Sequence, residues 1–342
     1  MHDSPDAALA GDNPLDFLRA LDGPSALFFP GIDTTRTRAF VTLLHGNEPS
    51  GLIALRRWLM SGQRPAVNTL AVVASVHAAL AEPAFSYRML PRARDLNRCF
   101  APPFEGAQGE LARAIVDLLD QHRLEALVDM HNTSGSGPSF GVVNHLDPQH
   151  DALVALFTRR LIVSRLNLGA LMELSTPASP YVTLEVGGRE DPEAHELAWD
   201  GLQRYFLRDE VLHDDADHDW GLEVLQHPIR LELRDGVTLC YSERPQPGYD
   251  ITLQPDIEHF NFGTVDARNC LGWANGDLQS LFRAQDGEGR CAVSTLLRQR
   301  DGGLYPARSL KLFMITNNAT IAQTDCLCYA VADDGSPLRS VA

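Results

Sequence analysis

Lysine is almost absent from this chain, and so is any long apolar run. Lys311 is the only lysine among 342 residues, and Lys and Arg together number 29 against 45 Asp and Glu. The net charge of −16 and the lack of a basic block argue against a surface that binds nucleic-acid phosphates. No stretch approaches the roughly 18 apolar residues of a membrane span, so we expect no membrane partner.

The first residues also lack a basic start followed by an apolar stretch, so we predict no secretion signal. Six cysteines are scattered along the chain. A large chain without such a signal is expected to keep reduced thiols in the cytoplasm. Cys326 and Cys328 are too close for an ordinary disulfide, and on a strand they would share one face as packing residues.

The length favours about two domains, and a hydrophobic fraction of 44% allows a sizeable core. Between about residues 25 and 206, strand and helix patterns alternate. This alternation predicts an α/β domain whose mostly parallel or mixed sheet is flanked by helices. Strands are expected at 39–44, 69–76, 124–130, 140–143 and 181–186, and helices at 52–59, 109–122, 151–166 and 191–206.

The pattern changes at the acidic run of residues 214–219. Beyond it, short apolar segments are split by Gly, Pro and Asp, and helical periodicity is weak. We therefore predict a larger domain over residues 1–212 and a smaller, β-rich C-terminal domain over residues 213–342. The β-rich segments are expected at 229–233, 237–241, 251–253, 310–315 and 327–331.

Two expected strands end in residues that bind metals. Residues 45–51 read HGNEPSG after one apolar run, and residues 129–135 read DMHNTSG at the end of another. In an α/β sheet, ligands bind beyond the carboxyl ends of the strands. Two His and one Glu are a common protein ligand set for catalytic zinc, so His45, Glu48 and His131 are candidate ligands. Asp129 shares a strand face with His131, and is either its orienting partner or a satisfied strand-end residue.

Two further segments carry polar residues whose positions suggest a catalytic or binding role. Glu185 lies between apolar residues on a strand that otherwise reads as core, where a carboxylate is rare unless it is paired, metal-bound or catalytic. Residues 95–100, DLNRCF, close an arginine-rich loop. Arginine beside Asn97 is suited to holding a carboxylate through two hydrogen bonds.

HGNEPSG, DLNRCF, DMHNTSG and LEVGG, in this order, resemble the succinylglutamate desuccinylase/aspartoacylase family, which is related to the zinc carboxypeptidases. The resemblance covers roughly residues 35–206. It implies an α/β zinc-peptidase domain followed by a small β-rich domain, and a hydrolase that cleaves the amide bond of small N-acyl amino acids. It also implies residue roles: His45, Glu48 and His131 bind one Zn²⁺ per chain, Glu185 is the general base, and Asn97 and Arg98 bind a substrate carboxylate. Asn132 and Thr133 are further candidate substrate-binding residues.

The chain departs from the family pattern in two places. The family has an oxyanion-stabilising Arg shortly before its DLNR motif, and the usual interval ends on Leu90 here. Arg88 and Arg92 flank that position, and we choose Arg88 as the catalytic residue because it follows Tyr87, outside the Pro91 turn. The family's Asn-Pro after the second strand is replaced by residues 75–77, so the preferred substrate stays open.

Three other readings compete with this one. Residues 137–141, GPSFG, match the nucleophile elbow of serine hydrolases. That elbow needs a strand before it and a helix after it, whereas a Ser/Gly loop precedes Ser139 and an apolar strand follows. A zinc carboxypeptidase acting on short peptides or cell-wall fragments would share the metal site. A non-enzymatic metal-binding protein would leave Glu185 and Arg98 without a role. The sequence does not indicate the oligomeric state, and a homo-oligomer is possible.

Overall fold

The computed structural model describes residues 1–133, 135, 137–165, 167–215, 217–324 and 326–333. Within these residues the chain divides into two compact units. Unit 1 comprises Met1–Asn132, Ser139–Ile162 and Leu166–Val224, and unit 2 comprises Thr133–Pro138, Val163–Arg165 and the chain from Leu225 onward. Residues 213–224 therefore group with the first unit, although the sequence assigns them to the second domain.

A nine-stranded mixed sheet, in the order β1-β2-β4-β3-β5-β8-β6-β7-β9, organises the first part of the chain. Strand β3 pairs in parallel with both β4 and β5, while β2–β4 and β6–β8 are antiparallel pairs. The strands are β1 (His2–Asp3), β2 (Ser25–Phe29), β3 (Asp33–Thr42), β4 (Val67–Val73), β5 (Ala126–Thr133), β6 (Phe140–Val143), β7 (Arg160–Val163), β8 (Tyr181–Gly188) and β9 (Glu223–Gln226). The helices are α1 (Pro14–Leu21), α2 (Ser50–Ser61), α3 (Val76–Leu80), α4 (Gly106–Gln121), α5 (Pro148–Ala155) and α6 (Pro192–Leu207).

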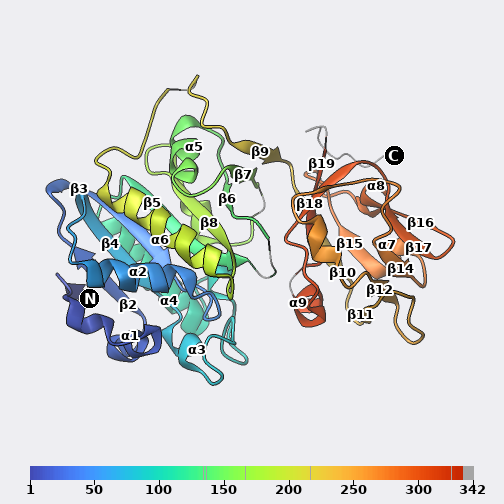
Figure 1. Cartoon of the computed structure of the whole chain (residues 1–342), viewed down its shortest axis with the longest axis horizontal. Coiled ribbons are helices and arrows are strands. Elements are labelled where there is room, and N and C mark those ends of the chain that lie inside the picture. Colours follow the sequence, from blue (N-terminus) through green and yellow to red (C-terminus); the bar gives the residue numbers. More distant parts are fainter. Residues whose placement is uncertain (134, 136, 166, 216, 325, 334–342) are drawn as a thin grey trace. The chain divides into compact units, whose positions relative to one another are not determined.

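Helices cover both faces of this sheet, as the sequence pattern predicts (Figure 1). Ala39 and Val41 of β3 belong to the core that includes buried residues of α4. Phe40, between them on the strand, meets Phe206 of α6 edge-on, with ring centroids 6.0 Å apart. Because side chains alternate along a strand, α4 and α6 lie on opposite faces. The predicted α/β class is confirmed.

Helix α2 begins directly against β3. A Cβ on Gly51, in the first turn of α2, would lie 2.2 Å from Thr42 Oγ1 at the end of β3. Only glycine permits so close an approach of helix and strand. The HGNEPSG segment therefore turns tightly from β3 into α2, which fixes where His45 and Glu48 can lie.

One predicted helix is wrong in its second half. Residues 151–166 read as one helix, but α5 ends at Ala155 and the chain continues into strand β7. Leu161, Ile162 and Val163 form most of this strand, and β-branched residues favour strands. Neither Gly nor Pro marks the boundary, so the apolar run continues across it in the sequence. The expected strand at 69–76 also ends early, since β4 stops at Val73 and α3 begins at Val76.

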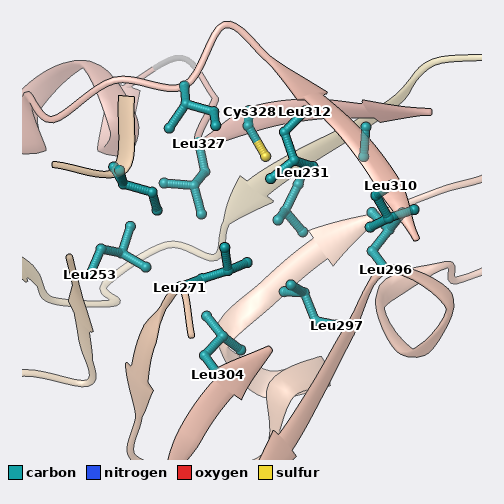
Figure 2. Close-up of a pocket in the computed structure, with 13 residues that line it drawn as sticks. Leu231, Leu253, Leu271, Leu296, Leu297, Leu304, Leu310, Leu312, Leu327 and Cys328 are labelled. Carbon is teal, nitrogen blue, oxygen red and sulfur yellow. The ribbon is translucent and has the colours of Figure 1, made fainter. Parts of the chain in front are cut away.

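The second unit is β-rich, as predicted, and holds two five-stranded sheets in the orders β13-β18-β19-β10-β15 and β11-β12-β14-β17-β16. Figure 2 shows apolar side chains of both sheets, such as Leu231 and Leu304, around an apolar pocket in its interior. The strands are β10 (Ile229–Leu233), β11 (Leu239–Tyr241), β12 (Ile251–Leu253), β13 (Thr264–Val265), β14 (Gly272–Ala274), β15 (Phe282–Ala284), β16 (Leu297–Arg300), β17 (Gly303–Pro306), β18 (Leu310–Phe313) and β19 (Cys328–Ala332). The short helices are α7 (Leu278–Leu281), α8 (Val293–Leu296) and α9 (Ala319–Thr324). Cys326 and Cys328 are both buried, and all six cysteines are free thiols.

Among the described residues, no helix is both long enough and apolar enough to cross a membrane.

Candidate metal centre

The three predicted metal ligands converge in the structure. His45 and Glu48 lie in the turn between β3 and α2, and His131 lies near the end of β5. All three are buried, and one potential ligand atom from each lies within 4.8 Å of the others. Glu48 Oε1 lies 2.8 Å from His45 Nδ1, and Glu48 Oε2 lies 2.7 Å from His131 Nδ1. Parallel pairing of β3 with β5 places the two strand ends side by side, which brings the ligands together.

The donor atoms fit a divalent transition metal. The two Nδ1 atoms are 3.2 Å apart. Ligands held about 2.0–2.1 Å from a tetrahedral zinc ion lie about 3.3 Å from one another. Imidazole nitrogen together with carboxylate oxygen is a donor set that zinc accepts readily. These residues therefore fit the zinc site that the sequence predicts.

A carboxylate holds the other ring nitrogen of each histidine. Asp95 Oδ1 is 3.0 Å from His45 Nε2, and Asp129 Oδ2 is 2.8 Å from His131 Nε2. Such a carboxylate fixes the proton on Nε2 and leaves Nδ1 free to bind a metal. Of the two readings left open for Asp129, the structure shows the orienting contact. Asp95 was not assigned a role from the sequence, although its motif was recognised.

The charges in this cluster are strongly coupled. Burial raises the pKa of Glu48, but the two histidines outweigh it and hold this pKa below its usual range. Burial likewise raises the pKa of Asp95. The hydrogen bond to His45 and the charge of Arg88 outweigh burial and hold this pKa well below its usual range. Burial lowers the pKa of His131, yet Asp129 and Glu48 raise it well above its ordinary value. A positive charge at this position is therefore strongly stabilised.

Glu185 lies on β8, the neighbour of β5 in the sheet. Its Oε2 atom is buried and has no hydrogen-bond partner among the described residues. Burial raises the pKa of Glu185 to about 8, with His131 and Arg88 lowering it and Glu48 raising it. A carboxyl group with a buried, unpartnered oxygen and a pKa near neutrality is suited to exchanging a proton with substrate or water.

Of the two candidate arginines, Arg88 lies at the cluster. Its Nε and NH2 atoms both donate to Asp95 Oδ2, at 3.0 and 2.9 Å, and its NH1 lies 3.6 Å from Glu48 Oε1. Arg92 is exposed and has a positive φ of 68°. The geometry thus favours Arg88 as the cation beside the metal ligands.

Asn97 also reaches the cluster, and Arg98 follows it in the short 3₁₀ helix Leu96–Arg98. Asn97 Oδ1 accepts a hydrogen bond from Leu171 N at 3.0 Å, which orients its Nδ2 to within 3.5 Å of His131 Nε2. Since Nε2 of His131 already carries the proton shared with Asp129, the Asn97 amide hydrogens stay available to a ligand. Arg98 is half-buried, and its NH1 donates to the backbone oxygen of Asn97 at 2.7 Å.

The other two candidate substrate-binding residues make hydrogen bonds within the protein. Asn132 Nδ2 donates to Ser50 Oγ at 2.7 Å and to Gly187 O at 2.9 Å, so both amide hydrogens are engaged. Thr133 Oγ1 donates to Gly135 O at 2.9 Å. Their role in substrate binding stays a prediction. Ser139 hydrogen-bonds with Thr158 and precedes strand β6, not a helix, so the nucleophile elbow is absent at this serine.

The fold and this cluster define an α/β domain with a buried centre that can hold a metal ion. Residues 36–198 match the model of the succinylglutamate desuccinylase/aspartoacylase catalytic domain. This match covers just under half of the chain and agrees with the family that the four motifs indicate. Among curated protein sequences, none matches the chain significantly.

Solved structures share the fold at low sequence identity. A succinylglutamate desuccinylase/aspartoacylase from Rhodobacter sphaeroides is 15% identical, with 90% of this chain and 87% of that chain covered and a TM-score of 0.55. For murine aminoacylase 3 the identity is 18%, the coverage 87% and 95%, and the TM-score 0.51. For the product-bound ectoine utilization protein EutE from Ruegeria pomeroyi the identity is 16%, the coverage 90% and 87%, and the TM-score 0.52.

Proposed function

We propose that this chain is a zinc-dependent hydrolase that cleaves the amide bond of N-acyl amino acids. One observation carries the proposal: the buried ligand set of His45, Glu48 and His131 stands together with an unpaired carboxylate, Glu185, and a cation, Arg88. A binding protein would need the ligands alone. The additional acid–base group and cation are the parts that amide hydrolysis requires.

Each residue has a distinct part in the reaction. Zinc, when bound by His45, Glu48 and His131, would lower the pKa of a water molecule to about 7 and polarise the substrate carbonyl. Glu185 takes the proton from water and passes it to the leaving amine, which suits a carboxyl whose pKa lies near neutrality. Arg88 faces the oxygen that becomes negative, and one such donor contributes on the order of 10²–10³ in rate.

Asn97 and Arg98 bind the free carboxylate of the substrate. The Asn97 amide hydrogens are oriented by the bond from Leu171 and point toward the cluster. A guanidinium next to them can hold a carboxylate through two parallel hydrogen bonds. Holding the substrate at both ends converts binding energy into orientation of the scissile amide. The acyl group, the amino acid, the oligomeric state and a cytoplasmic location stay predictions.

A substrate screen tests the proposal. The zinc-loaded protein is incubated with N-succinyl, N-acetyl and N-formyl derivatives of acidic and neutral amino acids, and the released amine is measured. We expect turnover of at least one series, loss of it after chelation, and recovery on adding zinc. His131→Ala should contain less zinc than the wild-type protein. Chelator-resistant turnover, or equal zinc content in both proteins, would contradict the assignment.

A further inference from the structure

A hydrogen-bonded network of Ser50, Asn132 and His195 lies next to the metal ligands. Asn132 Oδ1 accepts from Ser50 N at 3.0 Å, and Asn132 Nδ2 donates to Ser50 Oγ at 2.7 Å and to Gly187 O at 2.9 Å. Ser50 Oγ is also 2.7 Å from Nδ1 of His195 on α6. Ser50 and Asn132 are both buried. The family resemblance assigns no role to Ser50 or His195.

The network joins the three chain segments that carry the site. Ser50 is two residues after Glu48, Asn132 is next to His131, and Gly187 is two residues after Glu185. These segments come from the start of α2, from β5 and from β8. The Asn132 carboxamide therefore belongs to one segment and hydrogen-bonds to the backbone of the other two. A shift of any segment would break at least one of these hydrogen bonds.

The bond between Ser50 and His195 depends on the protonation of the histidine. The Ser50 hydroxyl oxygen accepts a hydrogen from Asn132, so its own proton is free to be donated to His195 Nδ1. This direction requires a neutral His195 with its proton on Nε2. Burial lowers the pKa of His195, which favours this neutral form, although the charges of Asp191 and Glu196 raise it. Helix α6 packs along α2 on one face of the sheet, so His195 supports Ser50 from outside the site (Figure 1).

We propose that Asn132, Ser50 and His195 are positioning residues that hold Glu48, His131 and Glu185 at the separations needed for zinc binding and turnover. This inference rests on the proposed function of the same site. Asn132, in this role, serves the site by joining its segments and not by touching substrate. Groups that orient metal ligands from outside contribute about 10–100-fold in metal affinity or activity when removed.

Three variants test the network. Ser50→Ala removes the oxygen that joins Asn132 to His195, and His195→Leu removes the outer partner. Each should weaken zinc binding about 10-fold in chelator competition and lower kcat by a similar factor, with little change in KM. His195→Asn restores a polar atom near the position of Nδ1 and should recover most of both losses. The double variant Ser50→Ala/His195→Leu should be little worse than either single variant, because both break one connected unit.

A second buried Ser–His pair provides the matched control. Ser175 Oγ is 2.8 Å from His150 Nε2 and accepts from the backbone N of Tyr181 at the start of β8. Ser175→Ala should lower the melting temperature but leave zinc affinity and kcat unchanged. Ser50→Ala and His195→Leu variants with wild-type zinc affinity and kcat would overturn the proposal, and so would a failure of His195→Asn to exceed His195→Leu. Zinc affinity is measured without substrate, so this outcome is distinguishable from a failure of the proposed hydrolase activity.

Discussion

The carboxylate of Asp95 contacts His45, a proposed metal ligand, with one oxygen and Arg88, the proposed catalytic cation, with the other. Oδ1 lies 3.0 Å from His45 Nε2 and accepts from Asn97 N at 2.9 Å, while Oδ2 accepts two bonds from Arg88. Asp95→Asn keeps the size of this side chain but supplies only one acceptor oxygen. The amide oxygen should stay at the Oδ1 position, where two N–H groups meet, and the new NH₂ would then face Arg88.

The expected loss is mainly in catalysis. Two charge-assisted hydrogen bonds to Arg88 are replaced by donor–donor repulsion, so the guanidinium is no longer held toward the reacting oxygen. Loss of one well-placed donor of this kind costs on the order of 10²–10³ in kcat, or about 3–4 kcal/mol. His45 keeps a neutral acceptor, so zinc affinity should fall by only about 10-fold.

The assay compares kcat at saturating zinc with zinc affinity from chelator competition, for wild type, Asp95→Asn, Arg88→Gln and the double variant. If Asp95 acts through Arg88, the kcat of the double variant should be close to that of Arg88→Gln. Any further loss should be no larger than the effect that Asp95→Asn has through His45. A kcat for Asp95→Asn within about twofold of wild type would refute the reasoning. Fully additive losses in the double variant would separate Asp95 from Arg88.

Further predictions concern Glu185, Arg98 and His150. Glu185→Gln is nearly isosteric but cannot take a proton, so it should lose about 10²–10⁴-fold in kcat while retaining zinc; near-wild-type turnover would remove Glu185 as the base. Arg98→Lys replaces a planar fork with a point charge and should lose efficiency on an acidic N-acyl amino acid but not on the corresponding amide; equal fractional losses would remove the carboxylate role. Burial lowers the pKa of His150 from 6.5 in the folded protein. As the pH drops below about 6.5, the unfolded state binds a proton at this histidine more readily than the folded state, so the free energy of unfolding should decrease. The melting temperature of the chelator-treated protein should therefore decrease less between pH 7.5 and 5.5 in His150→Gln than in wild type. Asp151, with a pKa raised to about 6, acts in the opposite direction in both proteins, and an equal decrease in both would contradict the role of His150.

The sequence predicts the parts of this site that depend on local pattern. An apolar run ending in HGNE or DMH indicates a strand end, and parallel strands bring their ends together, so the convergence of His45, Glu48 and His131 follows. The position of Glu185 on a buried strand follows in the same way. Strand β6, Phe140–Val143, is predicted with its observed bounds because its apolar run is short and clearly limited.

Contacts between distant segments are not predictable in this way. His195 meets Ser50 across 145 residues, through the packing of α6 on α2, and although Ser50 belongs to the HGNEPSG motif, no local pattern predicts its contact with His195. The roles of Asp95 and Arg88 depend on the path of an irregular loop, which periodicity does not specify. Strand β7 was missed because its apolar residues continue the helical pattern of α5, and only pairing in the sheet separates the two.

If the cluster of His45, Glu48 and His131 holds a metal ion, the carboxylates around it also influence which ion it prefers. With both histidines neutral and Glu185 protonated, the charges of Glu48, Asp95, Asp129 and Arg88 leave two negative charges in this mostly buried cluster. A divalent cation brings this sum to zero, whereas a monovalent ion leaves part of it uncompensated and a trivalent ion exceeds it. Charge balance therefore favours a divalent ion but does not select the element. Nitrogen and oxygen donors of this kind bind cobalt, nickel and copper as well as zinc, with affinity rising toward copper. The metal found in the protein would then follow the supply of free ions where the chain folds, and cobalt or nickel substitution should give a spectroscopic view of the centre.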